Sequence, residues 1–410
     1  MEAHHEFAAR SLTKPLRIAL VTETYPPEIN GVAMTLGRMV EGLLRRGHSV
    51  QLVRPRQATD ETANEPASAK GVDEILVRGL PIPGYSGLKF GLPAKGRLVR
   101  LWWEARPDLV HVVTEGPLGW SAVAAARKLK LPVTSDFHTN FHSYCRHYGL
   151  GWLQSPMSAY LRKLHNHSSA TLVPTQTLAR NLDGEGYRNL AVVSRGVDID
   201  LFNPGRRSIA LRAIWGVAPD SLVVIYVGRL APEKNLPVVL DAFAAIRAKR
   251  PDARLLLVGD GPMRGSLQTS CPDAIFAGMR TGNDLAAHYA SADLFLFASL
   301  TETFGNVTSE ALASGLAVLA YDCAAAADLI IDGSNGRTVP PGDAAAFVSA
   351  ALALACDPKK SRQMRSRSAR SVAHLDWELI HDRFEQTLAG AVGMHDKPGY
   401  GQQEFAVMPD

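Results

Sequence analysis

The stretch DLFLFASLTETFGNVTSEALASGLAVLAYD (293–322) decides the fold class of this chain. It contains two short apolar runs, DLFLFAS (293–299) and LAVLAYD (316–322), separated by a loop and a segment expected to be helical. Continuous apolar runs of this length are typical of strands that are buried on both faces of a parallel sheet. A strand, a helix and a second strand in this order predict a βαβ unit.

The same alternation of apolar runs and helical segments extends through the whole chain. In the second half the predicted strands lie at 222–230, 253–260, 274–278, 293–299 and 316–322. In the first half they lie at 17–23, 49–55, 73–80, 108–114, 132–138 and 170–175. A length of 410 residues suits two domains of ordinary size. The sequence therefore predicts an α/β protein with two Rossmann-like, doubly wound domains that face each other across a cleft.

The composition favours a globular protein that works in a reducing compartment. Hydrophobic residues make up 46% and charged residues 20% of the chain, as is usual for globular domains. No run reaches the roughly 18 apolar residues of a membrane span, and residues 1–17 lack the apolar core of a signal peptide. The four cysteines include no CxxC pair, so neither a disulfide framework nor a zinc site is expected. We expect a cytoplasmic location.

Positive charge is concentrated in the first half of the chain. Residues 1–192 contain 23 Lys or Arg and 16 Asp or Glu, a net charge of +7, whereas the remainder has a net charge of −3. The segment KGRLVRLWWEARP (95–107) places an apolar set at helical spacing beside three basic residues: Leu98, Leu101, Trp102 and Ala105, beside Lys95, Arg97 and Arg100. Peripheral contact with the inner membrane face fits this pattern. An anionic soluble partner, a helix packed on its sheet and uneven surface charge are the alternatives; no nucleic-acid partner is expected.

A first candidate site is VGRLAPEKNL (227–236), which follows a predicted strand. Gly228 permits a tight turn, and a helix is predicted to start near Leu236. Backbone N–H groups at a helix N-terminus attract phosphate. Arg229 can bind two phosphate oxygens through its planar guanidinium, and Lys234 adds a compact charge. The turn therefore predicts a phosphate site, with a solvated strand-to-helix turn as the alternative.

A second candidate site is TETFGNVTSEALASG (301–315), in which two glutamates lie eight residues apart. Gly305 allows a ligand to approach the backbone closely. Eight helical residues rise about 12 Å, so Glu302 and Glu310 cannot flank one bond as the paired carboxylates of a glycosidase do. Glu310 suits the hydroxyl pair of a ribose, and Glu302 suits a sugar. The alternative is that Glu302 only complements the helix dipole.

Three further positions follow predicted strands and are expected to face the cleft. In TETYPPEINGV (22–32) the amide of Gly31 can face a diphosphate, and the absence of GxGxxG there weighs against NAD. His138 directly follows an apolar strand and can hydrogen-bond a sugar hydroxyl, although a single histidine is often structural. VGDGP (258–262) and the backbone of Met279 are predicted to line a base pocket.

These motifs, in this order, resemble those of the GT-B retaining glycosyltransferases, in particular carbohydrate-active family four. The resemblance covers about residues 17–390, and its most specific element is the spaced-glutamate motif of Glu302 and Glu310. HVVTEGPLGWSA, SDFHTNFHSYCRHYGLGWL, SRGVDIDLFNP and YDCAAAADLI are similar to stretches of bacterial GDP-mannose-dependent α-mannosyltransferases and related lipid glycosyltransferases. One departure is Arg195 in SRGVD, where many relatives carry Asn.

The resemblance implies roles for the candidate residues. Arg229 and Lys234 would hold the donor diphosphate, and Glu310 would bind the ribose. The residues expected to contact the donor are Gly31, Gly228, Arg229, Lys234, Met279, Glu302, Phe304, Gly305, Asn306 and Glu310. Those expected to serve catalysis are His138, Arg229, Lys234 and Glu302.

The implied reaction moves a hexose, with retention, from a nucleotide sugar to a lipid or glycan acceptor. The donor would be GDP-mannose or UDP-glucose. Residues 16–195 would bind the acceptor, residues 196–375 would bind the donor, and a helix over 376–392 would return to the first domain or stay apart from it. No DxD motif occurs at the expected strand end, so neither a metal nor another cofactor is expected. The alternatives are a nucleotide-sugar-binding protein without transfer activity and a GT-B epimerase.

Overall fold

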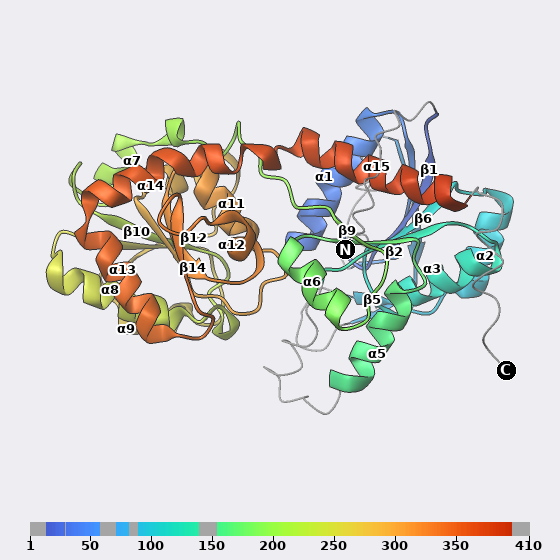
Figure 1. Cartoon of the computed structure of the whole chain (residues 1–410), viewed down its shortest axis with the longest axis horizontal. Coiled ribbons are helices and arrows are strands. Elements are labelled where there is room, and N and C mark those ends of the chain that lie inside the picture. Colours follow the sequence, from blue (N-terminus) through green and yellow to red (C-terminus); the bar gives the residue numbers. More distant parts are fainter. Residues whose placement is uncertain (1–13, 29, 58–70, 82–88, 139–153, 396–410) are drawn as a thin grey trace, which may run out of the picture. The chain divides into compact units, whose positions relative to one another are not determined.

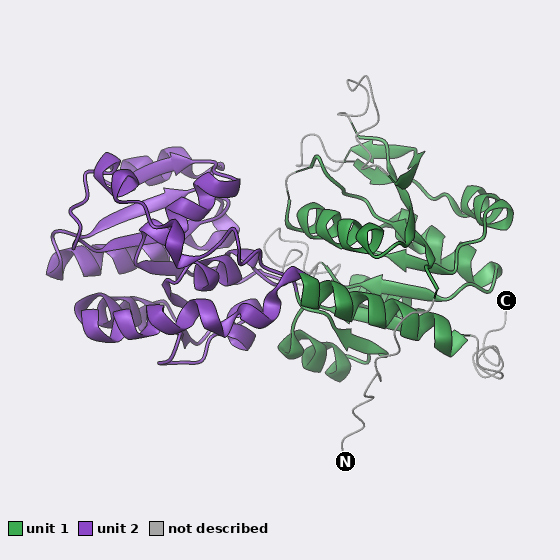
Figure 2. Ribbon diagram, turned by 90° about the horizontal axis from the view of Figure 1, so that it is seen from above, with its two compact units in different colours: residues 1–145, 150–194, 378–410 green, residues 146–149, 195–377 purple. Residues whose placement is uncertain are grey.

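The computed structural model describes residues 14–28, 30–57, 71–81, 89–138 and 154–395 (Figure 1). These residues form two compact units, which have different colours in Figure 2. Unit 1 extends to Ser194 and takes up the chain again at Glu378, and unit 2 is Arg195–Trp377. The last helix among the described residues, α15 (Trp377–His395), therefore belongs almost entirely to unit 1.

Unit 1 is built on a parallel sheet of seven strands among its described residues. In spatial order these are β3 (Val72–Val77), β2 (Ser49–Pro55), β1 (Arg17–Val21), β6 (Leu109–Val112), β7 (Val133–Asp136), β8 (Ala170–Val173) and β9 (Leu190–Val192). Its helices are α1 (Gly31–Arg45), α2 (Lys95–Glu104), α3 (Pro117–Lys128), α5 (Gln154–His165), α6 (Gln176–Gly184) and α15. A short antiparallel pair, β4 (Gly79–Pro81) and β5 (Lys89–Gly91), lies outside the main sheet.

Unit 2 is built on a six-stranded parallel sheet. In spatial order its strands are β12 (Ile275–Gly278), β11 (Arg254–Val258), β10 (Val223–Val227), β13 (Leu294–Phe297), β14 (Ala317–Tyr321) and β15 (Gly336–Val339). Its helices are α7 (Ile209–Ile214), α8 (Leu236–Lys249), α9 (Arg264–Ser270), α10 (Gly282–Ser291), α11 (Asn306–Ala313), α12 (Ala324–Leu329), α13 (Ala344–Cys356) and α14 (Pro358–Ser371). The strand order is that of a Rossmann fold.

Each sheet has a topological switch point, where the strand order reverses. It lies between β1 and β6 in unit 1 and between β10 and β13 in unit 2. In open α/β sheets, ligands bind beyond the carboxyl ends of the strands at such a point. The segments that follow these four strands are therefore the places to look for a site.

Each apolar run identified in the sequence contains a strand. Most of these strands are buried on both faces, which explains why their residues are apolar. In β10 and β14 every residue is buried. The prediction of one strand over 73–80 was wrong: β3 ends at Val77 and β4 begins at Gly79. The backbone turns there because β4 leaves the parallel sheet to pair with β5, and Gly79 packs directly against Pro55. The short strands β5, β9 and β15 were not predicted.

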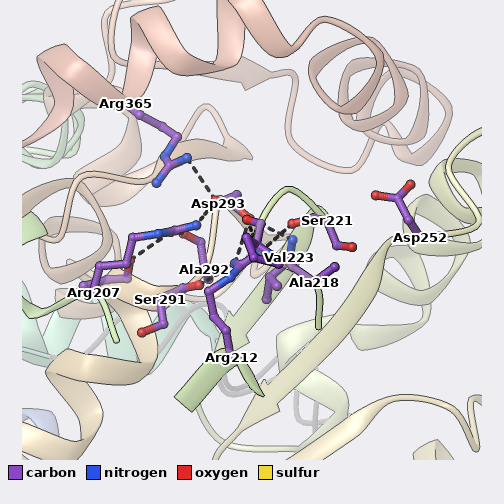
Figure 3. A network of polar contacts seen from close by, with 12 residues as sticks. Arg207, Arg212, Ala218, Ser221, Val223, Asp252, Ser291, Ala292, Asp293 and Arg365 are labelled. Carbon is purple, nitrogen blue, oxygen red and sulfur yellow. Dashed lines mark hydrogen bonds and ion pairs between the residues drawn. The ribbon is translucent and has the colours of Figure 1, made fainter. Parts of the chain in front are cut away.

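The amino ends of β10 and β13 are held together by a cluster of charges around Asp293 (Figure 3). The Asp293 carboxylate accepts hydrogen bonds from three guanidinium groups, at distances of 2.9 to 3.2 Å: those of Arg207, Arg212 and Arg365. It also accepts from the backbone N–H of Val223, which opens β10, at 2.9 Å. This cluster lies at the amino ends of the strands, whereas a ligand is expected at their carboxyl ends. Its role is therefore to stabilise unit 2.

Helix α15 packs on unit 1 through charge and ring contacts. Arg46, at the end of α1, pairs with Glu378, Asp382 and Glu385 on one face of the helix. Phe384 lies edge-on to the ring of His111 on β6, with the ring centroids 5.3 Å apart. Helix α15 therefore contributes to the core of the first unit.

Candidate active site

The predicted phosphate turn lies at the carboxyl end of β10. Gly228 has a φ of +149°, which residues with a side chain rarely adopt. Arg229 is half exposed, and its Nη1 lies 3.5 Å from Glu233 Oε1. Helix α8 begins at Leu236, as predicted. The first N–H groups of a helix have no partner within the helix, so the turn combines a cation with backbone donors.

Lys234 and Glu302 lie together at the switch point of unit 2. The Nζ of Lys234 donates a hydrogen bond to Glu302 Oε1, and Ser299 Oγ donates to the same oxygen at 2.8 Å. The two charged side chains are 19% and 16% exposed. Lys234 follows β10 and Glu302 follows β13, so this pair joins the two strand ends between which the strand order reverses.

Glu310 lies inside α11 and has a different partner. The hydroxyl of Tyr289, on α10, donates a hydrogen bond to Glu310 Oε2 at 2.9 Å. Burial of the carboxyl raises its pKa from 4.5 to about 7, although the Tyr289 hydrogen bond acts in the opposite direction. Glu302 and Glu310 thus have separate surroundings, and that they touch different parts of one ligand stays a prediction.

The backbone between the two glutamates turns sharply into α11. Gly305 precedes the helix with a φ of +90°, which explains the glycine, and Asn306 is the first helical residue. Phe304 is buried, and its carbonyl accepts a hydrogen bond of 2.8 Å from the N–H of Ala325. This bond ties the loop after β13 to the first turn of α12, the helix that follows β14.

Cys323 and Ala324, at the start of α12, follow β14 and were not predicted as site residues. Cys323 lies beside Ser299, with its Sγ 3.8 Å from the Ser299 carbonyl oxygen. Burial and the nearby charge of Glu302 raise the pKa of this thiol to about 11, so it stays neutral. Ala324 has a φ of +50°, a conformation that costs a non-glycine residue energy and is often found at functional sites.

The predicted base pocket and Met279 lie on the neighbouring strands of unit 2. Gly259 and Gly261 follow β11 with φ values of +130° and +157°, and a Cβ on either would collide with backbone atoms of Gly228 or Leu230. These glycines therefore allow the ends of β10 and β11 to approach closely. Met279 follows β12, and its side chain is exposed.

In unit 1, Gly31 is the first residue of α1. Asn30 caps this helix, because its Oδ1 accepts a hydrogen bond from the N–H of Ala33 at 2.9 Å. A Cβ built on Gly31 meets no atom within 4 Å. Packing within unit 1 therefore does not require glycine at this position.

His138 follows β7 and is held by carboxylates of its own unit. Its Nε2 lies 3.0 Å from Asp136 Oδ2, and its backbone N–H donates to Glu115 Oε1 at 3.3 Å. The His138 side chain is almost fully buried. Asp136 and Glu115 were not predicted as site residues; the signal that could have found them is their place at the end of β7 and in the loop that follows β6.

The basic segment at 95–107 forms α2, which packs its apolar face into unit 1. Leu98 and Trp102 are completely buried, and Trp102 Nε1 donates to Gln51 Oε1 at 3.1 Å. The neighbouring Trp103 is 77% exposed. The apolar face that the sequence offered for membrane contact is thus part of the core, and a different tryptophan faces outward.

The described residues contain neither a membrane-spanning helix nor a cluster of metal ligands. Among the described helices, none has both the length and the apolar character needed to cross a membrane. Within the described ranges, His, Cys, Asp and Glu side chains do not form a group of three that could hold a metal ion.

Comparisons with known proteins assign the two halves to one family. Residues 29–201 match the model described as Glycosyltransferase Family 4, and residues 221–357 match that described as Glycosyl transferases group 1. The chain is 32% identical over 371 residues to the GDP-mannose-dependent alpha-mannosyltransferase of Mycobacterium tuberculosis, covering 90% of this chain and 94% of the relative. It is 28% identical to the alpha-monoglucosyldiacylglycerol synthase of Streptococcus pneumoniae, over 75% and 71% of the two chains.

Solved structures agree on the fold. The crystal structure of Anabaena HepE in complex with UDP superimposes with a TM-score of 0.72 at 22% sequence identity, covering 92% of this chain and all of the other. Two parallel Rossmann-like sheets, motifs at both switch points and these matches lead to one assignment: the chain belongs to glycosyltransferase family four and is a glycosyltransferase with the GT-B fold.

Proposed function

We propose that this glycosyltransferase is a retaining hexosyltransferase that transfers mannose from GDP-mannose to a lipid or glycan acceptor. UDP-glucose is the second donor to consider. The observation that carries the proposal is the Lys234–Glu302 pair at the switch point of unit 2, next to Arg229 and the N-termini of two helices.

The donor diphosphate is assigned to the turn after β10. Arg229 offers two parallel N–H groups and Lys234 offers a compact charge, a combination suited to phosphate oxygens. In the structure Lys234 is already neutralised by Glu302. A bound diphosphate therefore competes with Glu302 for this lysine, and the carboxylate is released toward the donor sugar. Gly31, which has open space around its Cα, is assigned to the diphosphate from unit 1.

The remaining parts of the donor are assigned by the chemistry of the side chains. Glu310 can accept hydrogen bonds from both ribose hydroxyls when it is ionised. Glu302 and the backbone amides of Phe304, Gly305 and Asn306 can hold the sugar and its phosphate, because an N-terminal helix turn presents N–H groups to anions. Met279 contributes its backbone near the base.

The reaction needs charge stabilisation more than it needs a nucleophile from the protein. As the bond between sugar C1 and the phosphate oxygen breaks, negative charge develops on the nucleoside diphosphate, and Arg229 and Lys234 stabilise it. The acceptor hydroxyl attacks C1 on the same face, and its proton passes to the departing phosphate oxygen. The products are the glycoside and a nucleoside diphosphate. His138 is assigned to the sugar, and the cations of the protein make a metal ion unnecessary.

The choice of donor and acceptor rests on relatives and on charge. The 32% identical relative is named for GDP-mannose and the 28% identical one for a glucosylated diacylglycerol. A lipid acceptor also fits the net charge of +7 over residues 1–192, since basic residues are attracted to anionic membranes. We therefore propose that the protein works at the cytosolic face of the membrane, with Trp103 and the basic residues of α2 in contact with lipid.

A ligand panel followed by a transfer assay tests this function. GDP, UDP, ADP and their sugars are compared by thermal shift, where a ligand at 100 times its Kd stabilises by about 2.7 kcal/mol. The best donor is then incubated with lipid and glycan acceptors in excess chelator. Glycoside formation without metal supports the proposal. Donor binding without transfer would identify a binding protein, conversion of the donor sugar an epimerase, and activity only with added magnesium or manganese would overturn metal independence.

A further inference from the structure

Two imidazole–carboxylate pairs, each with a buried imidazole ring, meet at His138 in unit 1. The first pair is His111 and Asp136: His111 Nε2 lies 3.4 Å from Asp136 Oδ2. The second is His165 and Glu115: His165 Nε2 lies 3.6 Å from Glu115 Oε1. Both imidazole rings are completely inaccessible to solvent. Polar and ionisable groups are costly to bury, so an arrangement with two such pairs at one residue calls for an explanation.

The first pair contacts the ring of His138. The same oxygen of Asp136 lies 3.0 Å from His138 Nε2 and 3.4 Å from His111 Nε2. Burial opposes ionisation of Asp136, but the adjacent imidazole of His111 and the hydrogen bond with His138 outweigh it and hold the pKa of Asp136 well below the usual range. An ionised carboxylate accepts hydrogen bonds and donates none. The nitrogen of His138 that faces Asp136 must therefore carry a proton.

The second pair contacts the backbone of His138. Glu115 Oε1 accepts a hydrogen bond from the His138 N–H at 3.3 Å. His165 is fixed in turn, because its Nδ1 lies 2.9 Å from Ser135 Oγ. Glu115 thus binds the main chain of His138, and Asp136 binds its ring. Each of these carboxylates also contacts a buried histidine.

We propose that Asp136 is a positioning residue for the transfer reaction, which fixes the imidazole of His138 with a proton on Nε2 and so sets the ring edge presented to the donor sugar. The inference rests on the proposed function, in which His138 lies at that sugar. The ring of His111 is fixed because its Nδ1 lies 2.9 Å from Thr134 Oγ1. Its Nε2 therefore stays next to the Asp136 carboxylate. The logic is that of a carboxylate that selects the tautomer of a catalytic histidine.

The competing view is that Asp136 only fastens β7 to β6. Both views predict a loss of stability when Asp136 is changed, so stability does not separate them. They differ in the state of the His138 ring and in whether the effects of the two residues on turnover depend on each other. The test therefore uses the nearly isosteric variant Asp136→Asn, with Asp183→Asn, an exposed aspartate on α6, as the matched control.

The first measurement is the tautomer of His138 by long-range ¹H–¹⁵N correlation at pH 8, with ¹⁵N-labelled histidine and assignment by His138→Ala. The neutral ring is expected to carry its proton on Nε2 in the wild type and in Asp183→Asn, and to become a mixture in Asp136→Asn. A wild-type ring with its proton on Nδ1, or identical spectra for the wild type and Asp136→Asn, would overturn the proposal. This measurement needs no substrate, so it holds even if the proposed reaction fails.

The second measurement is turnover of the full chain. Asp136→Asn is expected to bind nucleoside diphosphate as the wild type does and to lose about tenfold or more in kcat, the effect of one good hydrogen bond. The double variant with His138→Ala is expected to be no slower than His138→Ala alone, because residues that act as a unit are not additive. Wild-type kcat in folded Asp136→Asn, or a double variant that shows both losses multiplied, would contradict the positioning role. A wild type that transfers no hexose would instead count against the proposed function.

Discussion

Lys234 donates a hydrogen bond to Glu302, a residue 68 positions away in the chain, across the point where the strand order of unit 2 reverses. The pair places a cation and a carboxylate where an open α/β sheet binds its ligand. Its members were expected to contact different parts of the donor, and the structure shows that each is also the other's partner. This coupling determines how variants of the site should behave.

Lys234→Ala and Arg229→Ala are each expected to cripple transfer while leaving the fold intact. Losing one preorganised charge at a developing anion costs about 2.7–4 kcal/mol, or roughly 100–1000-fold in rate. Steady-state kinetics and thermal unfolding measure the two effects separately. Arg247 lies on α8 and forms an exposed ion pair with Asp273. The variant Arg247→Ala is therefore the control and should keep the wild-type rate. Full turnover by either folded site variant would sink the phosphate assignment.

Glu310→Gln and Glu302→Gln should fail at different steps. Glu310→Gln is expected to weaken GDP and GDP-mannose alike, by about tenfold or more, because a hydrogen bond to a charged group is lost. Glu302→Gln releases Lys234 from its ion pair, so GDP should bind as well as before or more tightly, while kcat falls. Titration of both nucleotides measures this. Equal GDP affinity in the wild type and Glu310→Gln would refute the ribose role.

The affinity for the donor is expected to rise with pH up to about 7 and then level off. Burial raises the pKa of Glu310 to about 7, and ribose hydroxyls favour the ionised carboxylate that accepts their hydrogen bonds. Below that pKa, binding must therefore release a proton, and affinity falls as pH falls. Calorimetry in buffers of different ionisation enthalpy detects the proton. Glu310→Gln keeps the titration of the phosphates themselves, so a wild-type pH profile in this variant would show that another group is responsible.

The sequence predicted most of the strands because these are buried on both faces and form continuous apolar runs. The edge strand β9 (Leu190–Val192) escaped because it is only three residues long, and β15 (Gly336–Val339) because its residues do not form such a run. Arg229, Lys234, Glu302 and Glu310 could be named as candidates because each stands in a motif at a strand end or in the helix after it.

The partners of these residues could not be predicted from spacing. Tyr289 is 21 residues from Glu310 and lies on a different helix, so no period connects them. Asp136 and Glu115 are single acidic residues at or after strand ends, a pattern that is common in ordinary polar turns. Their contacts with the buried His111 and His165 are visible only in the structure. Tertiary packing decides which carboxylate faces which imidazole, and one sequence does not contain that information.

Asp293→Ala is expected to destabilise unit 2 by about 3–5 kcal/mol, the cost of leaving a buried charge without its partner. The carboxylate serves three guanidinium groups (Figure 3), and Arg212 among them is only 3% exposed. Denaturant unfolding followed by tryptophan fluorescence measures the change. Asp252→Asn, which weakens an exposed pair with Arg250, should cost less than about 1 kcal/mol. Equal effects of the two substitutions would mean that the cluster carries no special stability.

The exposed face of α2 is expected to bind anionic membranes. Trp103 is 77% exposed on α2 and lies three residues after Arg100, so both share the face of the helix opposite the buried Leu98 and Trp102. Tryptophan favours the interface, and each basic residue near anionic lipid contributes about 1 kcal/mol. We expect salt-sensitive co-sedimentation with anionic vesicles, and its loss in Trp103→Ala and Arg100→Glu.

Neutral vesicles and the variant Trp102→Ala are the controls for nonspecific adsorption to lipid. Trp102 is a core residue, so its truncation should cost about 3–5 kcal/mol of stability, whereas Trp103→Ala should unfold at the wild-type temperature because it removes no buried contact. Binding that survives Trp103→Ala and Arg100→Glu would place the lipid surface elsewhere on the chain. Absence of co-sedimentation at low and at physiological salt would remove the membrane from the proposal, and the charge of +7 over residues 1–192 would then serve a soluble anionic acceptor or no partner at all.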